Sequence, residues 1–277
     1  MPAQRPSTIL IVPGFNEPSK DMLLLANGRH GKPGLSHYGF RCITFHNNPG
    51  DVMARIDRFA EFMQQLKAEG KETFPVATLG YSLGGLVVRG FLRKYPERSA
   101  DVSHTVMLGT PNWGLTSDMM PMLTSFFRLR DKAMKDLDLR SPFMWWLNGT
   151  LGQWEGKGKD RNWKLDGEPW VGPPGASLFS VIGAVPQYRS DNDGIVWKDS
   201  ATLDQRIPWS EVKDKRANHL NLVGAFNLGT FFIKGFIKND RVWPHCIEVI
   251  ARHIGGADIV PDMGAPASSR WHEGDPG

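Results

Sequence analysis

Residues 75–95 read PVATLGYSLGGLVVRGFLRKY, and this stretch decides the fold. Its first five residues are short and mostly apolar, as in a buried strand, whereas residues 83–95 have a helical pattern that Pro96 ends. Between the two stands a Gly-x-Ser-x-Gly sequence, the signature of a tight strand-to-helix turn that holds a serine hydroxyl clear of the backbone. The pattern predicts that Ser82 is a nucleophile.

Apolar runs alternate with helical patterns along most of the chain. We expect strands at residues 8–12, 40–45, 76–79, 104–108 and 178–182, and helices at residues 51–69, 83–95 and 244–254. This alternation predicts an α/β fold with a mostly parallel sheet of about six strands and helices on both faces.

Residues 112–176 interrupt the alternation, because a connection of about 65 residues is far longer than usual. The stretch is rich in tryptophan and methionine, and residues 118–138 have an amphipathic helical pattern. We expect residues 1–111 and 177–260 to form the core and residues 112–176 to form a cap or lid, either purely structural or lining an acyl pocket. Residues 261–277, rich in proline, glycine and serine, are expected to form a loose tail.

Composition excludes several classes of protein. The net charge is +4, and basic and acidic residues are interleaved, so no nucleic-acid partner is expected. No apolar run approaches the ~20 residues of a transmembrane segment, and the run at residues 8–12 is too short for a signal peptide. We therefore expect a cytoplasmic protein, unless a leader has been removed. Cys42 and Cys246 are expected to be buried thiols. The oligomeric state is not indicated.

A serine hydroxyl becomes nucleophilic when a histidine takes its proton and an acid orients that histidine. In this kind of fold the chain order is serine, acid, histidine. Asp193 follows the strand expected at residues 178–182, on a turn that belongs at the carboxyl edge of the sheet. Asp193 is therefore the expected acid, and Asp191 is its rival.

Four histidines follow Asp193 in the chain. His219 lies in a loop ahead of an apolar stretch, which suits a catalytic base. His245 and His253 lie on the last expected helix, where a structural role is the usual one, and His272 lies in the expected tail. The order of residues therefore favours His219 as the base.

An oxyanion hole needs two backbone N–H groups near the serine. The turn after the first strand supplies one in this architecture, and the residue after the nucleophile supplies the other. These are Phe15 and Leu83, because Pro13 has no N–H to donate.

Taken together, these segments resemble the α/β-hydrolase superfamily, and within it the bacterial triacylglycerol lipases and lipase-like esterases. The matching segments are VPGF at 12–15, GYSLGG at 80–85, LGTPNWG at 108–114, NDGIV at 192–196 and NHL at 218–220. The resemblance covers roughly residues 8–255 and implies an α/β-hydrolase fold with a cap. Two positions depart from the pattern. Pro13 stands where histidine is usual, and Asn221 stands where many of these lipases carry a calcium-binding aspartate, so no metal site is expected.

The expected activity is that of a serine carboxylic-ester hydrolase that cleaves apolar acyl esters through an acyl-enzyme on Ser82, with no cofactor. The expected partner is a small-molecule or lipid ester substrate, with transient contact to a lipid interface through the cap. Three alternatives stay open: a deacylase or depolymerase of a specialised lipid or polymer ester, an acyltransferase, and a non-catalytic relative that binds an apolar ligand.

Overall fold

A computed structural model describes residues 5–15, 19–46, 49–115, 132–150, 152–155, 162–184, 193, 195–214, 217, 219–222, 242–264 and 269–271. The main strands are β1 (Thr8–Val12), β2 (Arg41–Thr44), β3 (Val76–Tyr81), β4 (Val102–Leu108), β7 (Ser177–Ala184), β8 (Trp209–Lys213) and β9 (Ser269–Trp271). The longer helices are α1 (Ser19–Asn27), α2 (Val52–Glu69), α3 (Leu83–Lys94) and α8 (Val242–Gly255), and α7 (Lys198–Thr202) is short.

Seven strands form one sheet in the order β8-β7-β4-β3-β1-β2-β9, and every neighbouring pair is parallel. The predicted parallel α/β sheet is confirmed. The sheet has seven strands where about six are expected, and its edge strands β8 and β9 lie outside the ranges predicted for strands. From β1 the strand order runs one way to β2 and then the other way to β3 and β4, so β1 and β3 are neighbours although β2 lies between them in sequence. Loops that follow such a pair of strands diverge, which leaves room for a ligand at their carboxyl ends.

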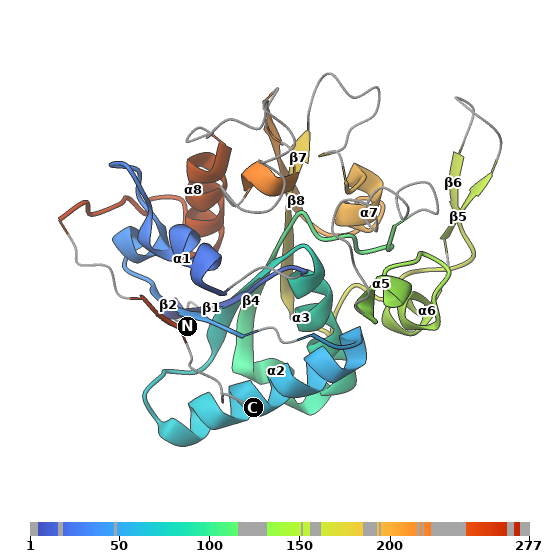
Figure 1. The fold of residues 1–277 in the computed structure, drawn as a ribbon, viewed down its shortest axis with the longest axis horizontal. Helices are drawn as coiled ribbons and strands as arrows, with labels where there is room; N and C mark the ends of the chain where they lie inside the picture. Colours follow the sequence, from blue (N-terminus) through green and yellow to red (C-terminus); the bar gives the residue numbers. More distant parts are fainter. Residues whose placement is uncertain are drawn as a thin grey trace.

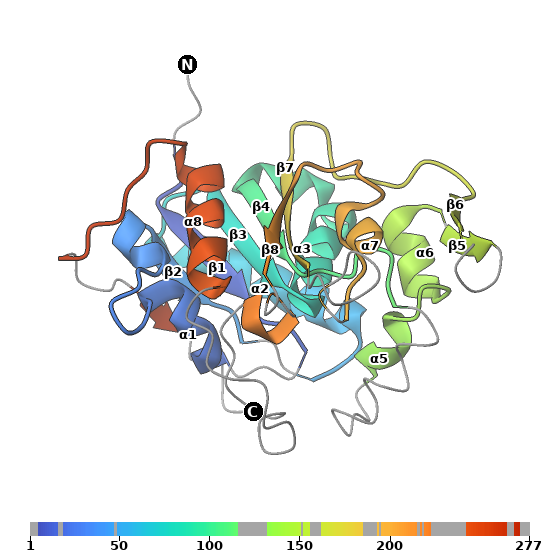
Figure 2. The ribbon, with the colours of Figure 1, turned by 90° about the horizontal axis from the view of Figure 1, so that it is seen from above.

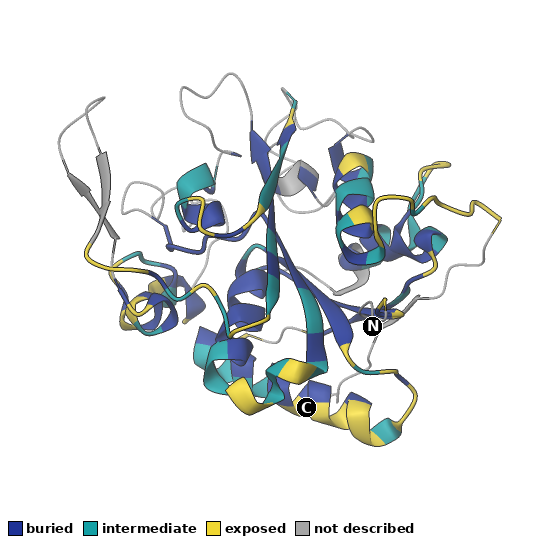
Figure 3. Cartoon of the chain, turned by 180° about the vertical axis from the view of Figure 1, so that it is seen from behind, coloured by how far each residue is buried: buried dark blue, intermediate teal, exposed yellow. Residues whose placement is uncertain are grey.

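Helices cover both faces of the sheet, α2 and α3 on one side and α1 and α8 on the other (Figure 1). The sequence of strand β1 is apolar because helices cover both of its faces. Leu10 and Val12 join the core cluster beneath α2 and α3, whereas Ile9 and Ile11 join the cluster beneath α1 and α8. A strand buried on both faces reads as a continuous apolar run. The central strands are accordingly buried, whereas the outer surface of α2 is exposed (Figure 3).

Helix α2 begins and ends at capping residues. The Asp51 side chain accepts a hydrogen bond from the Ala54 amide at 2.8 Å, and Gly70 ends the helix in the left-handed conformation with φ of 64°. The helix fits the predicted range of 51–69 to within a residue.

The described part of residues 112–176 contains the helices α5 (Ala133–Asp136) and α6 (Pro142–Asn148) and an antiparallel pair, β5 (Gly152–Glu155) and β6 (Asn162–Leu165). These elements lie at the end of the molecule opposite α1 and α8 (Figure 2). Most of the helix expected at 118–138 falls outside the described residues. The division into core, cap and tail stays a prediction.

Strand β9 pairs with β2 within the segment expected to be a loose tail, and residues 265–268 and 272–277 lie outside the described residues. Cys42 and Cys246 are buried free thiols, as predicted. None of the described helices has the length and apolar character that would let it cross a bilayer.

Candidate active site

Ser82 stands at the turn between β3 and α3, with φ of 51° and ψ of −122°. Such a conformation is costly for a residue with a side chain and persists only where the surrounding structure imposes it. The Ser82 amide donates to the Leu108 carbonyl at 2.9 Å. Neighbouring glycines allow the close contact: a Cβ on Gly80 would lie 2.5 Å from the Cα of Gly85, and one on Gly84 would overlap the Val12 carbonyl oxygen. The predicted tight turn is therefore present.

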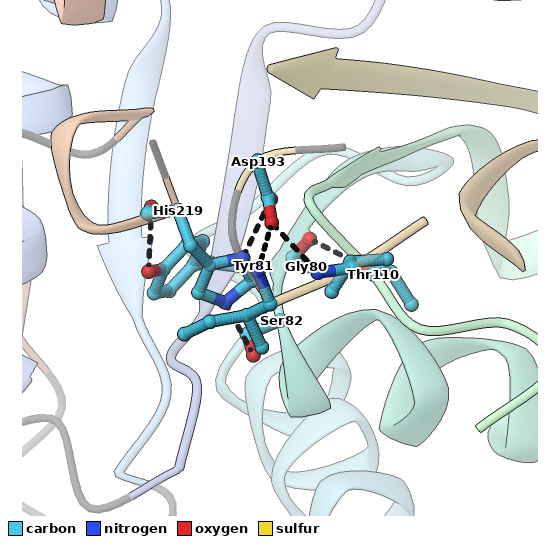
Figure 4. Close-up of polar contacts among 8 residues, drawn as sticks. Gly80, Tyr81, Ser82, Thr110, Asp193 and His219 are labelled. Atoms are coloured by element: carbon cyan, nitrogen blue, oxygen red, sulfur yellow. Dashed lines mark hydrogen bonds and ion pairs between the residues drawn. The ribbon is translucent and has the colours of Figure 1, made fainter. Parts of the chain in front are cut away.

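His219 begins the short 3-10 helix η4 (His219–Leu222) and faces Ser82 (Figure 4). Its Nε2 lies 2.9 Å from Ser82 Oγ, and its Nδ1 lies 2.7 Å from Asp193 Oδ2. His219 and Asp193 are only 5 % and 2 % exposed, respectively. The structure thus brings together three predicted residues that come from distant parts of the chain.

The Asp193 carboxylate is held on both of its oxygens. Oδ1 accepts hydrogen bonds from the amides of Ile195 at 3.0 Å and Val196 at 2.7 Å, which leaves Oδ2 for His219. The Asp193 carbonyl also accepts from the His219 amide at 2.9 Å. The acid and the base are therefore joined through backbone as well as side chain. Asp191, the rival acid, lies outside the described residues.

The two predicted oxyanion-hole residues, Leu83 and Phe15, belong to segments that adjoin the nucleophile. Leu83 is the first residue of α3, so its N–H has no acceptor within the helix. Phe15 follows Gly14, and a Cβ on Gly14 would lie 3.1 Å from the Cβ of Ser82. The turn after β1 therefore runs directly beside the serine.

Two residues that the sequence did not single out contact His219. The Tyr81 hydroxyl donates to the His219 carbonyl at 2.9 Å, and the two ring centroids are 5.1 Å apart. Gly109, with φ of 57°, lies against the same imidazole. Tyr81 occupies a variable position of the serine motif, and no local signal connects it with residue 219.

A buried arginine of α3 makes hydrogen bonds to residues in the 112–176 stretch. Arg89 is fully buried; its Nη1 donates to Asn112 Oδ1 at 3.1 Å, and its Nη2 donates to Asn148 Oδ1 at 3.0 Å and to the Trp170 carbonyl at 2.8 Å. Burial, and secondly the charge of Arg93, lower the pKa of Arg89 to about 9. Helix α3 is thus hydrogen-bonded through one side chain to three separate positions in residues 112–176.

The remaining late histidines lie away from Ser82 where they are described. His245 is an exposed residue of α8, and His253 stacks on Phe179 with ring centroids 4.0 Å apart. His272 lies outside the described residues. Within the described ranges, no group of three or more His, Cys, Asp or Glu residues is placed to hold a metal ion.

No model of a known protein family matches the sequence, and no curated protein matches it. Solved structures do match. The mature form of Bacillus licheniformis lipase BlEst2 superposes with a TM-score of 0.57 at 16 % identity, over 83 % of this chain and 90 % of that one. The metagenomic carboxyl esterase MGS0156 matches with a TM-score of 0.56 at 13 % identity, over 91 % and 76 % of the two chains.

Aspergillus fumigatus lipase B matches with a TM-score of 0.55 at 14 % identity, over 95 % of this chain and 59 % of that one. Identities this low establish a common fold and nothing finer. The predicted resemblance is therefore confirmed at that level: the chain has the α/β-hydrolase fold and resembles lipases and esterases in structure.

Proposed function

We propose that the protein is a serine carboxylic-ester hydrolase, lipase-like, with Ser82 as nucleophile, His219 as base and Asp193 as the acid that orients the base. The observation that carries this proposal is the continuous hydrogen-bonded chain from Ser82 Oγ through both ring nitrogens of His219 to Asp193, at 2.9 Å and 2.7 Å. Its place at the carboxyl edge of a parallel sheet, on a strained strand-to-helix turn, adds further support.

In the proposed reaction, His219 Nε2 takes the proton of Ser82 as Oγ attacks the carbonyl carbon of the ester. The tetrahedral intermediate then breaks its bond to the alcohol, which leaves with the proton held on Nε2. Water attacks the resulting acyl-enzyme, again losing a proton to Nε2, and the carboxylic acid departs as Ser82 recovers its hydrogen. Asp193 keeps the proton of the neutral ring on Nδ1, so that Nε2 can accept.

The amides of Leu83 and Phe15 are proposed to hold the oxyanion of the tetrahedral intermediate. The N–H of Leu83 has no acceptor within α3 and lies at the positive end of that helix, and the turn containing Phe15 lies beside Ser82. Each donor of this kind contributes about 3–4 kcal/mol to stabilising the transition state.

We propose an apolar acyl ester as the substrate and residues 112–176 as a cap beside the site. Apolar side chains of the described part of this segment, among them Leu115, Phe143 and Leu147, share one core cluster with residues of α3. Trp145 on α6 is 58 % exposed, which suits transient contact with a lipid interface. The lipases and esterases of similar fold support the same class of substrate.

The test is hydrolysis of p-nitrophenyl esters of increasing acyl length by the wild type, Ser82→Ala and Ser103→Ala. Ser103 is the matched control, because its hydroxyl donates to the Val76 carbonyl of β3. Ser103 lies at the start of β4, the end of that strand opposite the site. We expect activity that grows with acyl length, falls about a million-fold in Ser82→Ala and is kept in Ser103→Ala.

Activity retained in Ser82→Ala would refute the mechanism. Activity on short chains alone would refute the apolar acyl preference. Inertness of the wild type toward all these esters and toward a serine-directed phosphonate would refute the proposed hydrolase function and favour a non-catalytic role.

A further inference from the structure

The residue immediately before the nucleophile contacts the base through two different groups. Tyr81 is the last residue of β3 and is 1 % exposed. Its hydroxyl donates to the carbonyl oxygen of His219 at 2.9 Å, and its ring lies beside the imidazole at an interplanar angle of 33° (Figure 4). The end of one strand therefore carries the nucleophile and also contacts the loop that holds the base.

The backbone at Gly109 also lies close to the imidazole of His219. A Cβ on Gly109 would lie 3.1 Å from both Cε1 and Nδ1 of the ring, which is closer than ordinary van der Waals contact. Gly109 follows β4 and has φ of 57°, a conformation that glycine adopts without strain. The imidazole thus has both Gly109 and the Tyr81 ring as close neighbours.

The backbone of His219 is held at both of its polar groups. Its N–H donates to the Asp193 carbonyl at 2.9 Å, and its carbonyl accepts from Tyr81. Because only two side-chain torsions separate the backbone of a histidine from its ring, a shift of the backbone moves Nε2 relative to Ser82 Oγ. General-base catalysis depends steeply on that geometry.

Tyr81 also contacts the turn that carries the proposed oxyanion donor. A Cβ on Gly14 would lie 3.0 Å from Cδ1 of the Tyr81 ring. The same side chain therefore touches the loop of the base and the turn ahead of Phe15, and it precedes Ser82 in the chain.

We propose that Tyr81 is a positioning residue that fixes His219 in line with Ser82 through its hydroxyl bond to the His219 carbonyl. The inference rests on the proposed function, because it assumes that His219 acts as the base. In this proposal Tyr81 takes up no proton and forms no bond in the reaction. It acts by holding the base in place, so its loss should lower turnover more than substrate affinity.

The test compares Tyr81→Phe with Tyr95→Phe. Tyr95 is a matched control because its hydroxyl likewise donates a hydrogen bond, to Asp57 Oδ1 at 2.7 Å. It stands directly after the C-terminal end of α3, the end remote from Ser82. Pre-steady-state bursts with a p-nitrophenyl ester count the competent active sites, so a loss of folded protein does not imitate a catalytic effect.

For Tyr81→Phe we expect kcat per burst site to fall about 3- to 10-fold while KM stays within about twofold, since one hydrogen bond to the base loop is lost. The proton resonance of His219 Nδ1–H should broaden as the ring gains freedom. Tyr95→Phe should keep the wild-type kcat and resonance.

A Tyr81→Phe enzyme with wild-type kcat per site and an unchanged resonance would overturn the inference, as would an equal fall in Tyr95→Phe. Ser82→Ala is assayed in parallel. If Ser82→Ala keeps its turnover, the proposed function itself fails. If Ser82→Ala is inactive while Tyr81→Phe matches the wild type, only the role of Tyr81 is refuted.

Discussion

Replacing Asp193 by asparagine should remove most of the turnover while leaving the fold intact. The two carboxylate oxygens have different partners: Oδ1 accepts from two backbone amides, and Oδ2 faces His219 Nδ1. An asparagine has one oxygen and one NH2 group to place in those two positions. If the NH2 faced the backbone, two buried N–H groups would lose their acceptor, at a cost of about 1–3 kcal/mol each.

The asparagine should therefore keep its oxygen toward the amides of Ile195 and Val196 and turn its NH2 group toward His219. Nδ1 must then accept a hydrogen bond, so the proton of the neutral ring moves to Nε2. Nε2 faces Ser82 Oγ and can no longer take its proton. A wrong tautomer of this kind lowers kcat by about 10,000-fold, or about 5 kcal/mol.

The assay is kcat on a p-nitrophenyl ester for Asp193→Asn and Asp191→Asn, with circular dichroism to verify the fold. Asp191 is the rival acid from the sequence, and Asp191→Asn should keep kcat within about threefold of the wild type. Asp193→Asn activity within about tenfold of the wild type would refute the tautomer argument. A large loss in Asp191→Asn alone would assign the acid to Asp191.

Two further predictions concern stability. Arg89→Met should lower the free energy of unfolding by about 3 kcal/mol in urea titrations, because the buried side-chain oxygens of Asn112 and Asn148 and the partly buried carbonyl of Trp170 lose their donor. A loss below about 1 kcal/mol would contradict the anchoring role. Burial, and secondly the neighbouring His104, lower the pKa of His253 to about 4 from the usual 6.5. The unfolded chain therefore binds this proton first, so stability is lost as the pH falls from about 6.5 towards 4. The loss is on the order of 1 kcal/mol after discounting for partial exposure, and His253→Phe should show a smaller fall in melting temperature between pH 7 and pH 5. An equal fall in both proteins would contradict the assignment.

The central strands of the fold could be predicted from sequence because helices cover them on both faces. Strands β1 and β3 are buried at every residue, so each reads as a short apolar run that a local pattern can reveal. Helix α2 could be predicted for a related reason, since its apolar stripe is regular and lies between recognisable caps at Asp51 and Gly70.

The edges of the sheet could not be predicted in this way. Strand β8 reads WSEVK, and only Val212 of its five residues is buried. Strand β9 has three residues that become a strand by pairing with β2, far away in sequence. In both strands the deciding interaction is a tertiary one, so the local sequence holds little of the signal.

In the candidate site, too, some residues could be predicted from the sequence and others could not. The order of Ser82, Asp193 and His219 along the chain is a one-dimensional pattern, and reasoning about required chemical groups could find it. The hydroxyl of Tyr81, in contrast, meets a carbonyl 138 residues away in sequence. Arg89 likewise has acceptors, Asn148 and Trp170, that come from a distant part of the sequence. Contacts of this kind depend on the folded backbone.

The most direct measurement of the central claim is covalent labelling of the intact protein with a fluorophosphonate, followed by mass spectrometry of its peptides. The account predicts one adduct per chain, on Ser82, which forms far more slowly in His219→Ala and is absent from Ser82→Ala. An adduct on another residue, or labelling of the wild type that is no faster than that of His219→Ala, would contradict the claim that His219 activates Ser82.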